Sequence, residues 1–227
     1  MDKVSQFLII APVLLFSMVA HEYAHGWAAF KNGDPTAYQL GRLTWNPAKH
    51  IDPFMTVILP VVLWLSGAPI LGGAKPVPVN PRNFRNFKRG DIMVSLAGVT
   101  TNVILAFIFA LIIPPLNLIA RLAPALTPGL AILQWMFVYG VGINLVLAAF
   151  NLLPIPPLDG SHVFKYVLPP AWALAYQRIS RYGLLIIYAV LFLGGPLLSY
   201  WLFPATALGG ALIGAVQSFL LPSPFAR

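Results

Sequence analysis

The sequence contains no cysteine and very few charged residues. Without cysteine the chain can form neither disulfide bonds nor thiolate metal sites, so any metal must be held by His, Asp or Glu side chains. Charged residues occupy 9% of the 227 positions and hydrophobic residues occupy 59%, whereas soluble domains are about 25% charged. This shortage of charge excludes an ordinary soluble globular protein. Only six residues are acidic, and Glu22 is the one glutamate among them.

Long apolar stretches take up most of the chain. A hydrocarbon core about 30 Å thick is crossed by about 20 apolar residues of helix. Five stretches meet this length or come close to it: residues 7–30, 92–120, 130–153, 183–203 and 205–221. We therefore predict an all-α polytopic membrane protein with about five to six transmembrane helices. Only short loops remain between these stretches, which predicts a single domain over residues 1–227 with a core near 7–165 and C-terminal helices within 183–221.

The basic residues lie mainly on one side of the predicted spans. The formal net charge is +8, and cytoplasmic loops of membrane proteins carry an excess of Lys and Arg. If residues 7–30 run from outside to inside and residues 54–71 do not cross the bilayer, twelve of the fourteen basic residues are cytoplasmic. The charge therefore indicates orientation in a lipid bilayer, and we expect no nucleic-acid partner.

The region between the first two long spans requires a different structure. Residues 54–71 are apolar, but Pro60, Gly67 and Pro69 interrupt them, which favours a re-entrant element over a full span. Residues 38–45 combine β-forming side chains with partial strand alternation. We predict a small β-hairpin or re-entrant element here, with residues 38–45 as a strand edge able to pair with an extended peptide. A plain loop is the alternative.

The first predicted span contains the sequence His21-Glu22-Tyr23-Ala24-His25. On a helix, residues four apart point in the same direction, so His21 and His25 present two imidazoles on one face. This is the spacing of two-His zinc ligation, and Glu22 beside it is placed to act as a general acid and base. A hydrogen-bonded polar patch between helices is the alternative, although polar groups within a span are costly without compensation.

A catalytic zinc ion takes three protein ligands and keeps one position open, so a third ligand is required. The candidates are Asp34, His50, Asp52, Asp159 and His162. Asp34 lies in a turn-forming sequence. Asp159 differs from the others because three prolines precede it closely at the end of a span, where the helix must stop and its backbone must line protein or a cavity. An ordinary Asp-Gly turn is the other interpretation of that position.

The two motifs together resemble the site-2 protease family of intramembrane zinc metalloproteases. The resemblance covers residues 7–165. It rests on H-E-x-x-H in the first span and on N-x-x-P-x-P-x-L-D-G at residues 151–160. The loops at 41–47 and 72–81 look like those of compact bacterial members without PDZ or CBS domains. It implies that His21, His25 and Asp159 bind one Zn²⁺ per chain, that Glu22 is the catalytic acid and base, and that Asn151 holds the substrate backbone or the developing oxyanion.

The resemblance also implies a substrate and a location. Members of the family hydrolyse peptide bonds in or near transmembrane segments of other membrane proteins. A bacterial inner or plasma membrane follows, with the active site towards the cytoplasm. The sequence does not specify the substrate or the oligomeric state.

One segment departs from the family pattern. Residues 97–102 match a helix that commonly reads A-G-P-x-x-N, but Val99 replaces the proline. Gly98 is typical of close helix packing. We interpret Asn102 as a polar contact between helices or as support for a ligand, and His162 as a solvated or supporting residue.

Two functions of other classes are alternatives. A metal-binding transporter would need polar residues on several facing spans, yet residues 183–221 contain no acidic residue or histidine. A catalytically inactive scaffold that binds transmembrane partners would more naturally lack Glu22 or a ligand. The sequence favours the protease over both.

Overall fold

The structure is a computed structural model that describes residues 3–66 and 72–224. Within these residues all regular elements are helices, and no strand is present. In this described part of the chain, four helices are long and apolar enough to cross a membrane: α1 (Lys3–Lys31), α4 (Phe87–Leu122), α5 (Thr127–Asn151) and α9 (Gly195–Ala215). The predicted all-helical membrane fold is therefore confirmed.

Shorter helices connect these four. The α-helices are α2 (Thr36–Gln39), α3 (Leu59–Ser66), α6 (Asp159–Phe164), α7 (Pro170–Ile179) and α8 (Gly183–Leu193). A π-helix, Pro53–Ile58, precedes α3. Single 3₁₀ turns lie at Pro47–Lys49, Pro81–Asn83, Pro124–Leu126, Ser180–Tyr182 and Gln217–Phe219.

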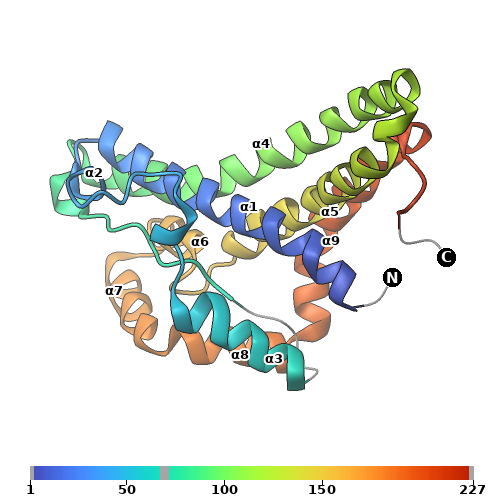
Figure 1. Ribbon diagram of the computed structural model, residues 1–227. Helices are drawn as coiled ribbons and strands as arrows, with labels where there is room; N and C mark the ends of the chain where they lie inside the picture. The colour runs from blue at the N-terminus through green and yellow to red at the C-terminus, as the bar shows by residue number, and fades with distance from the viewer. Residues whose placement is uncertain (1–2, 67–71, 225–227) are drawn as a thin grey trace.

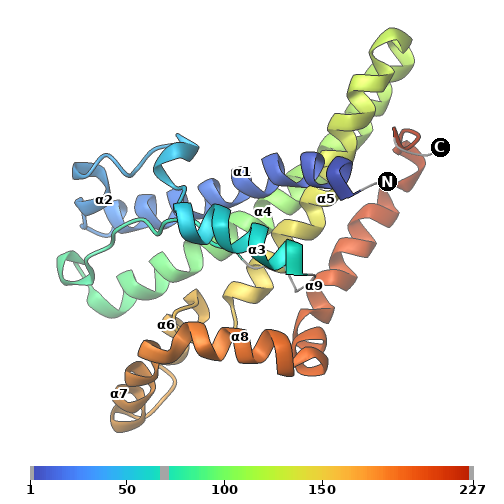
Figure 2. The same ribbon diagram turned by 60° about the horizontal axis from the view of Figure 1, so that its bottom comes forward.

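Helices α1, α4 and α5 lie side by side, and α9 packs against α5 (Figure 1). Their shared core includes Val13, Ala106, Phe109, Val141 and Leu145, all at most 6% exposed. The opposite faces of the helices remain apolar and exposed, as expected for surfaces that meet lipid. Helices α6, α7 and α8 follow one another along one side of this bundle, and the two termini lie near the same end of it (Figure 2).

The C-terminal spans differ from the prediction. Residues 183–203 do not form one span, because the helix breaks at Gly194 and a new helix begins with Gly195 and Pro196. Helix α8 has 11 residues, or about 16 Å at 1.5 Å per residue, which is too short to cross the bilayer. Helix α9 joins parts of both predicted C-terminal spans. The predicted count of five to six spans is not confirmed.

The prediction of a β-hairpin was wrong. Thr36–Gln39 is a helical turn, and the backbone N–H groups of Arg42 and Leu43 both donate to the carbonyl of Ala37. Gly41 has a φ of 63° and reverses the chain directly after the turn. These local hydrogen bonds use the groups that a strand edge would need for pairing. Residues 53–66 are helical and shorter than a span, and the rest of the predicted element, residues 67–71, lies outside the described residues.

Asp34 fixes the loops at the end of α1. One carboxylate oxygen accepts hydrogen bonds from the backbone N–H and hydroxyl of Thr36 and from the Asn83 amide, and the other accepts from the backbone N–H of Asn80 at 2.7 Å. Burial opposes ionisation of this carboxyl, but the hydrogen bonds outweigh burial, so the pKa of Asp34 lies below its ordinary value. Asp34 thereby anchors the extended segment 72–80, which runs back along α1.

We expect Asp34→Asn to lower the free energy of unfolding by about 2 kcal/mol at neutral pH, because it removes the charge that four donors share. A carboxyl with a lowered pKa stabilises the fold above its unfolded pKa of about 3.9 and loses that contribution as the pH falls through the folded value. Thermal unfolding in detergent should therefore show a large difference between the proteins at neutral pH and a small one in strong acid. Equal stability at neutral pH would contradict this role.

Candidate metal centre

Helices α1 and α6 bring three of the predicted site residues together. His21 and His25 lie one turn apart on α1, each 9% exposed, and their Nε2 atoms are 2.9 Å apart. Asp159 is the first residue of α6, and its Oδ2 lies 3.2 Å from Nε2 of His21 and 3.3 Å from Nε2 of His25. Within the described residues, these are the three side chains whose ligand atoms could hold a metal ion.

The chemistry of the three atoms fits a cation. Nδ1 of His25 donates to the carbonyl of Val94 at 2.7 Å, and Nδ1 of His21 donates to Oδ1 of Asn102 at 2.5 Å. Each Nε2 therefore presents a lone pair to the other. Oδ2 of Asp159 is buried and has no hydrogen-bond donor. Three acceptors that converge in this way repel one another unless a cation lies between them, and two nitrogens with one carboxylate oxygen are a common catalytic zinc set.

Gly98 on α4 leaves room beside the imidazoles. A Cβ atom at this position would lie 2.6 Å from Nε2 of His21 and 2.6 Å from Nε2 of His25. The sequence predicted close packing at Gly98. The structure shows that the partners are the imidazole rings of the two predicted ligands themselves.

A buried chain of hydrogen bonds supports His21. Nδ2 of Asn102 donates to Oδ1 of Asn144 at 2.8 Å, and Nδ2 of Asn144 donates to the hydroxyl of Ser17 at 2.9 Å. The three side chains are fully buried and come from α4, α5 and α1. Asn102 is thus a contact between helices and the partner that fixes the ring orientation of His21. Its support of a metal ligand stays a prediction.

We expect Asn102→Ala to weaken zinc binding about 10- to 100-fold, since groups that hold a ligand imidazole typically contribute this much. Competition with a chromogenic chelator on the purified protein would measure the change. Asn117→Ala is the matched control, because Asn117 is a buried asparagine of the same helix 15 residues further along the chain. Equal zinc affinity in the two variants would contradict the role of Asn102.

Glu22 lies one position after His21 and faces the extended segment. Its Oε2 accepts the backbone N–H of Val77 at 2.8 Å. Val77 is buried against Gly26, where a Cβ atom would approach its side chain to 2.9 Å. The segment that contains Val77 therefore orients the Glu22 carboxylate. Glu22 is not part of the cluster that His21, His25 and Asp159 form.

Asp159 reaches the two histidines because α6 begins close to the end of α5. A Cβ atom at Gly160 would overlap the backbone carbonyl of Leu152, so only glycine permits this approach. Asn151 is the last residue of α5, and its amide donates to the carbonyl of Leu147 at 3.0 Å in its own helix. The structure does not bring Asn151 into hydrogen-bond contact with the three predicted ligands.

The other candidate ligands lie elsewhere. Asp34 holds the loops described above. His50 is buried, and its Nε2 forms a hydrogen bond with the carbonyl of Thr44. Asp52 caps the π-helix by accepting from the N–H groups of Phe54 and Met55. His162 faces Asp91 at 3.4 Å. Asp91 was not singled out from the sequence, because nothing near it in the chain indicates a partner on α6.

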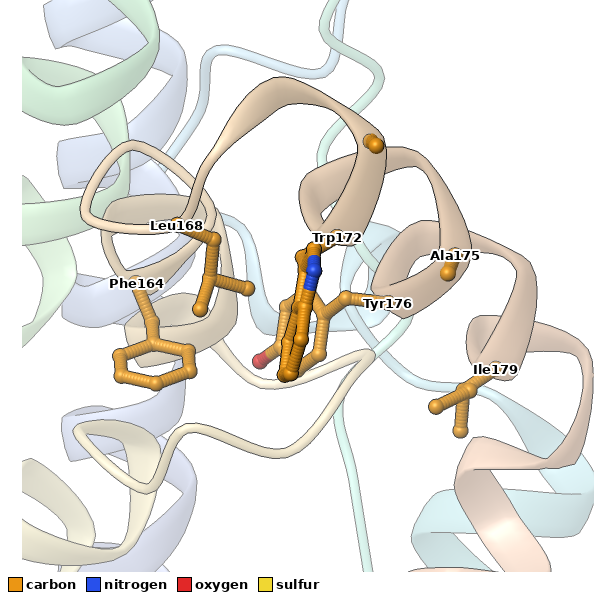
Figure 3. Close-up of a pocket in the computed structure, with 7 residues that line it drawn as sticks. Phe164, Leu168, Trp172, Ala175, Tyr176 and Ile179 are labelled. Atoms are coloured by element: carbon orange, nitrogen blue, oxygen red, sulfur yellow. The ribbon is translucent and has the colours of Figure 1, made fainter.

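An apolar groove of about 560 Å³ lies along α7. Figure 3 shows the side chains that line it, which include Phe164, Trp172, Tyr176 and Ile179. None of its lining residues is a histidine or a carboxylate. The groove therefore lacks the chemistry of the metal cluster and is a separate surface feature.

Comparisons with known proteins agree with the geometry. The model of Peptidase family M50 matches residues 115–194. YwhC of Bacillus subtilis is 40% identical over 200 residues, which are 87% of this chain and 84% of YwhC. Rip2 of Mycolicibacterium smegmatis is 30% identical over 205 residues, which are 89% of this chain and 73% of Rip2. MJ0611 of Methanocaldococcus jannaschii is 41% identical over 95 residues, 42% of this chain and 44% of MJ0611. All three carry names that assign them to the zinc metalloproteases, and no solved structure matches the chain significantly.

An apolar helical bundle with two histidines and a carboxylate clustered on its helices defines an integral membrane protein with a metalloprotease-type centre. The chain belongs to peptidase family M50, the site-2 proteases. It is a zinc metalloprotease that cleaves membrane proteins within the membrane. The comparisons do not favour a transporter or an inactive scaffold.

Proposed function

We propose that hydrolysis occurs at the cluster formed by His21, His25 and Asp159, with these three side chains as the zinc ligands. The observation that carries the proposal is the convergence of two imidazole lone pairs and one carboxylate oxygen within 4.8 Å of one another. Hydrogen bonds from the far nitrogen of each ring fix both imidazoles in the metal-binding tautomer.

Zinc, when bound there, supplies Lewis-acid polarisation of the water and of the scissile carbonyl. Glu22 takes a proton from the attacking water and then delivers it to the leaving amine. The hydrogen bond from the backbone N–H of Val77 occupies Oε2 of Glu22, which leaves Oε1 for the proton. Asn151 binds the substrate backbone or the developing oxyanion, since its hydrogen bond to Leu147 uses only one of its two amide N–H groups.

The substrates in this proposal are transmembrane segments of other proteins, which must unwind locally before an amide reaches the cluster. We place the centre on the cytoplasmic side of a bacterial inner membrane. Four spans put both termini outside, in keeping with their position at one end of the bundle (Figure 2). Eight of the fourteen basic residues then lie in the cytoplasmic segments between α1 and α4 and between α5 and α9, and three more, Lys31, Lys88 and Arg89, lie at the helix ends that adjoin them.

The single domain in this proposal extends to the last helix. Trp201 on α9 donates to the carbonyl of Ala149 on α5 at 2.8 Å. Gln134 on α5 donates to the carbonyl of Phe219 and accepts from the N–H of Leu221. The C-terminal helices are thereby joined to the core at 7–165.

Metal content tests the ligand set. Wild-type protein should retain one zinc ion per chain after dialysis, and His21→Ala and Asp159→Ala should lose it. Asp52→Ala is the control, because Asp52 caps a helix elsewhere and should leave the zinc content unchanged. Full zinc retention in Asp159→Ala would overturn the ligand set.

Cysteine labelling tests the orientation, and the cysteine-free chain makes each introduced thiol unique. Arg82→Cys should react only from the cytoplasmic side, and Ala125→Cys in the turn between α4 and α5 only from the outside. The reverse pattern would overturn the proposed topology.

A further inference from the structure

A second group of polar side chains surrounds Asp91 near the start of α4, outside the proposed zinc ligands. Asp91 is only 4% exposed. Its Oδ2 accepts from Nζ of Lys165 at 2.6 Å and from the hydroxyl of Tyr166 at 2.8 Å, and its Oδ1 lies 3.4 Å from Nδ1 of His162. The charge of a buried carboxylate is thus compensated by one cation and two further polar groups.

All three partners of Asp91 lie on α6 or directly after it. Helix α6 has six residues and carries Asp159 at its first position. At that end Gly160 fits closely against the carbonyl of Leu152. At the other end Lys165 and Tyr166 reach Asp91. So short a helix is not stable in isolation, so its contacts with the rest of the protein hold it in place, and these two attachments are among them.

The same face of α4 also supports the histidines. Asp91, Val94, Gly98 and Asn102 follow one another at intervals of three or four residues, which places them on one stripe of the helix. Val94 accepts from His25, Gly98 fits against both rings and Asn102 accepts from His21. Asp91 lies one turn before these residues on the same stripe. The stripe therefore contacts both α1, which carries the two histidines, and the end of α6, which carries Asp159.

We propose that Asp91 is a positioning residue for the metal centre, and that its ion pair with Lys165 holds α6 so that the Asp159 carboxylate meets the two imidazoles. The inference rests on the proposed role of Asp159 as a zinc ligand. Helix α4 thereby sets the relative placement of α1 and α6, which supply all three ligands. His162 belongs to this support and is not a ligand.

The partners of Asp91 suit a permanent attachment. Burial and the hydrogen bond to Asp91 raise the pKa of Tyr166 above its ordinary value, so the phenol keeps its proton and remains a donor. The ammonium of Lys165 also lies 5.1 Å from the centre of the Tyr166 ring. An apolar contact would have no preferred direction. These hydrogen bonds are directional, so they fix the position of α6 along α4 and its rotation about its own axis.

The test measures metal binding by the purified full chain in detergent. Asp91→Leu combined with Lys165→Met removes both charges together, so no unpaired charge is left buried and the protein should fold. We expect a zinc dissociation constant raised about 10-fold and an altered visible spectrum of the cobalt-substituted protein, because Asp159 shifts relative to the histidines. Arg178→Gln, which removes an exposed cation of neighbouring α7, should change neither.

Two further variants separate the outcomes. Tyr166→Phe removes one hydrogen bond and keeps the ion pair, and it should shift the cobalt spectrum in the same direction with a smaller loss of affinity. Wild-type affinity and spectrum in both the double variant and Tyr166→Phe would overturn the inference. Asp159→Asn is measured in parallel. If Asp159→Asn binds zinc as wild type does, the proposed ligand set itself fails. If Asp159→Asn loses zinc while the double variant and Tyr166→Phe match wild type, only the positioning role is overturned.

Discussion

Glu22→Gln should lower the rate of peptide-bond cleavage by about 10²- to 10⁴-fold or more while zinc stays bound. Glutamine has the shape of glutamate and can still accept the N–H of Val77, so the loop contact and the fold should persist. It cannot accept a proton from water or return one to the leaving amine. Cleavage of a single-span test protein in proteoliposomes, together with the zinc content of the same sample, measures both parts of this expectation.

The neighbouring residue provides a control. Tyr23→Phe lies on the same turn and removes a hydroxyl that the proposed chemistry does not use, so its cleavage rate should stay close to that of wild type. Full activity in Glu22→Gln would contradict the assignment of the acid and base. Loss of zinc from Glu22→Gln would mean that Glu22 supports the metal instead of the proton transfers.

Gly98→Ala should abolish zinc binding, and with it cleavage, although it adds a single methyl group. The new Cβ would lie 2.5 Å from Cε1 and 2.6 Å from Nε2 of His21, and 2.6 Å from Nε2 of His25, so both imidazoles are in its way. Either the methyl pushes both imidazoles away from the carboxylate of Asp159, or α4 moves away, which would lengthen the hydrogen bonds of Asn102 and Val94 to the imidazoles. Zinc content and chelator competition would measure the loss.

Gly142→Ala is the matched control for this substitution. Gly142 lies in the middle of α5, and a Cβ there meets no atom within 4 Å. Both variants should reach similar levels in the membrane and behave alike in size-exclusion chromatography. Zinc binding at wild-type affinity in Gly98→Ala would contradict the placement of the metal at the two imidazoles that Gly98 contacts.

The spacing of the motif was enough to predict the histidine pair, because four residues make about one helical turn whatever the helix packs against. The prolines before Asp159 set it apart from the other candidates because they stop a helix at a known point, and the resemblance to the site-2 protease family then implied that it is the third ligand. The supporting residues Asn102 and Asp91 depend on which face of α4 meets α1 and α6. That choice is made by packing between segments 70 to 80 residues apart, which local pattern does not specify.

The sequence likewise predicted part of the fold. Apolar length identified α1, α4 and α5, since burial in lipid requires it. It did not identify the break at Gly194, because α8 and α9 together form one continuous apolar run. The strand predicted at residues 38–45 was wrong because alternation over a few residues was outweighed by the hydrogen bonds that Arg42 and Leu43 make to Ala37.

The most direct test of the account is cleavage by the purified chain under control of its metal. A single-span protein and the chain are reconstituted together, zinc is removed with a chelator, and zinc is then restored. The account predicts cleavage within the transmembrane segment that stops on removal, returns on restoration, and is absent from Asp159→Ala under every condition. Cleavage that persists without zinc, or that Asp159→Ala supports at the wild-type rate, would contradict it.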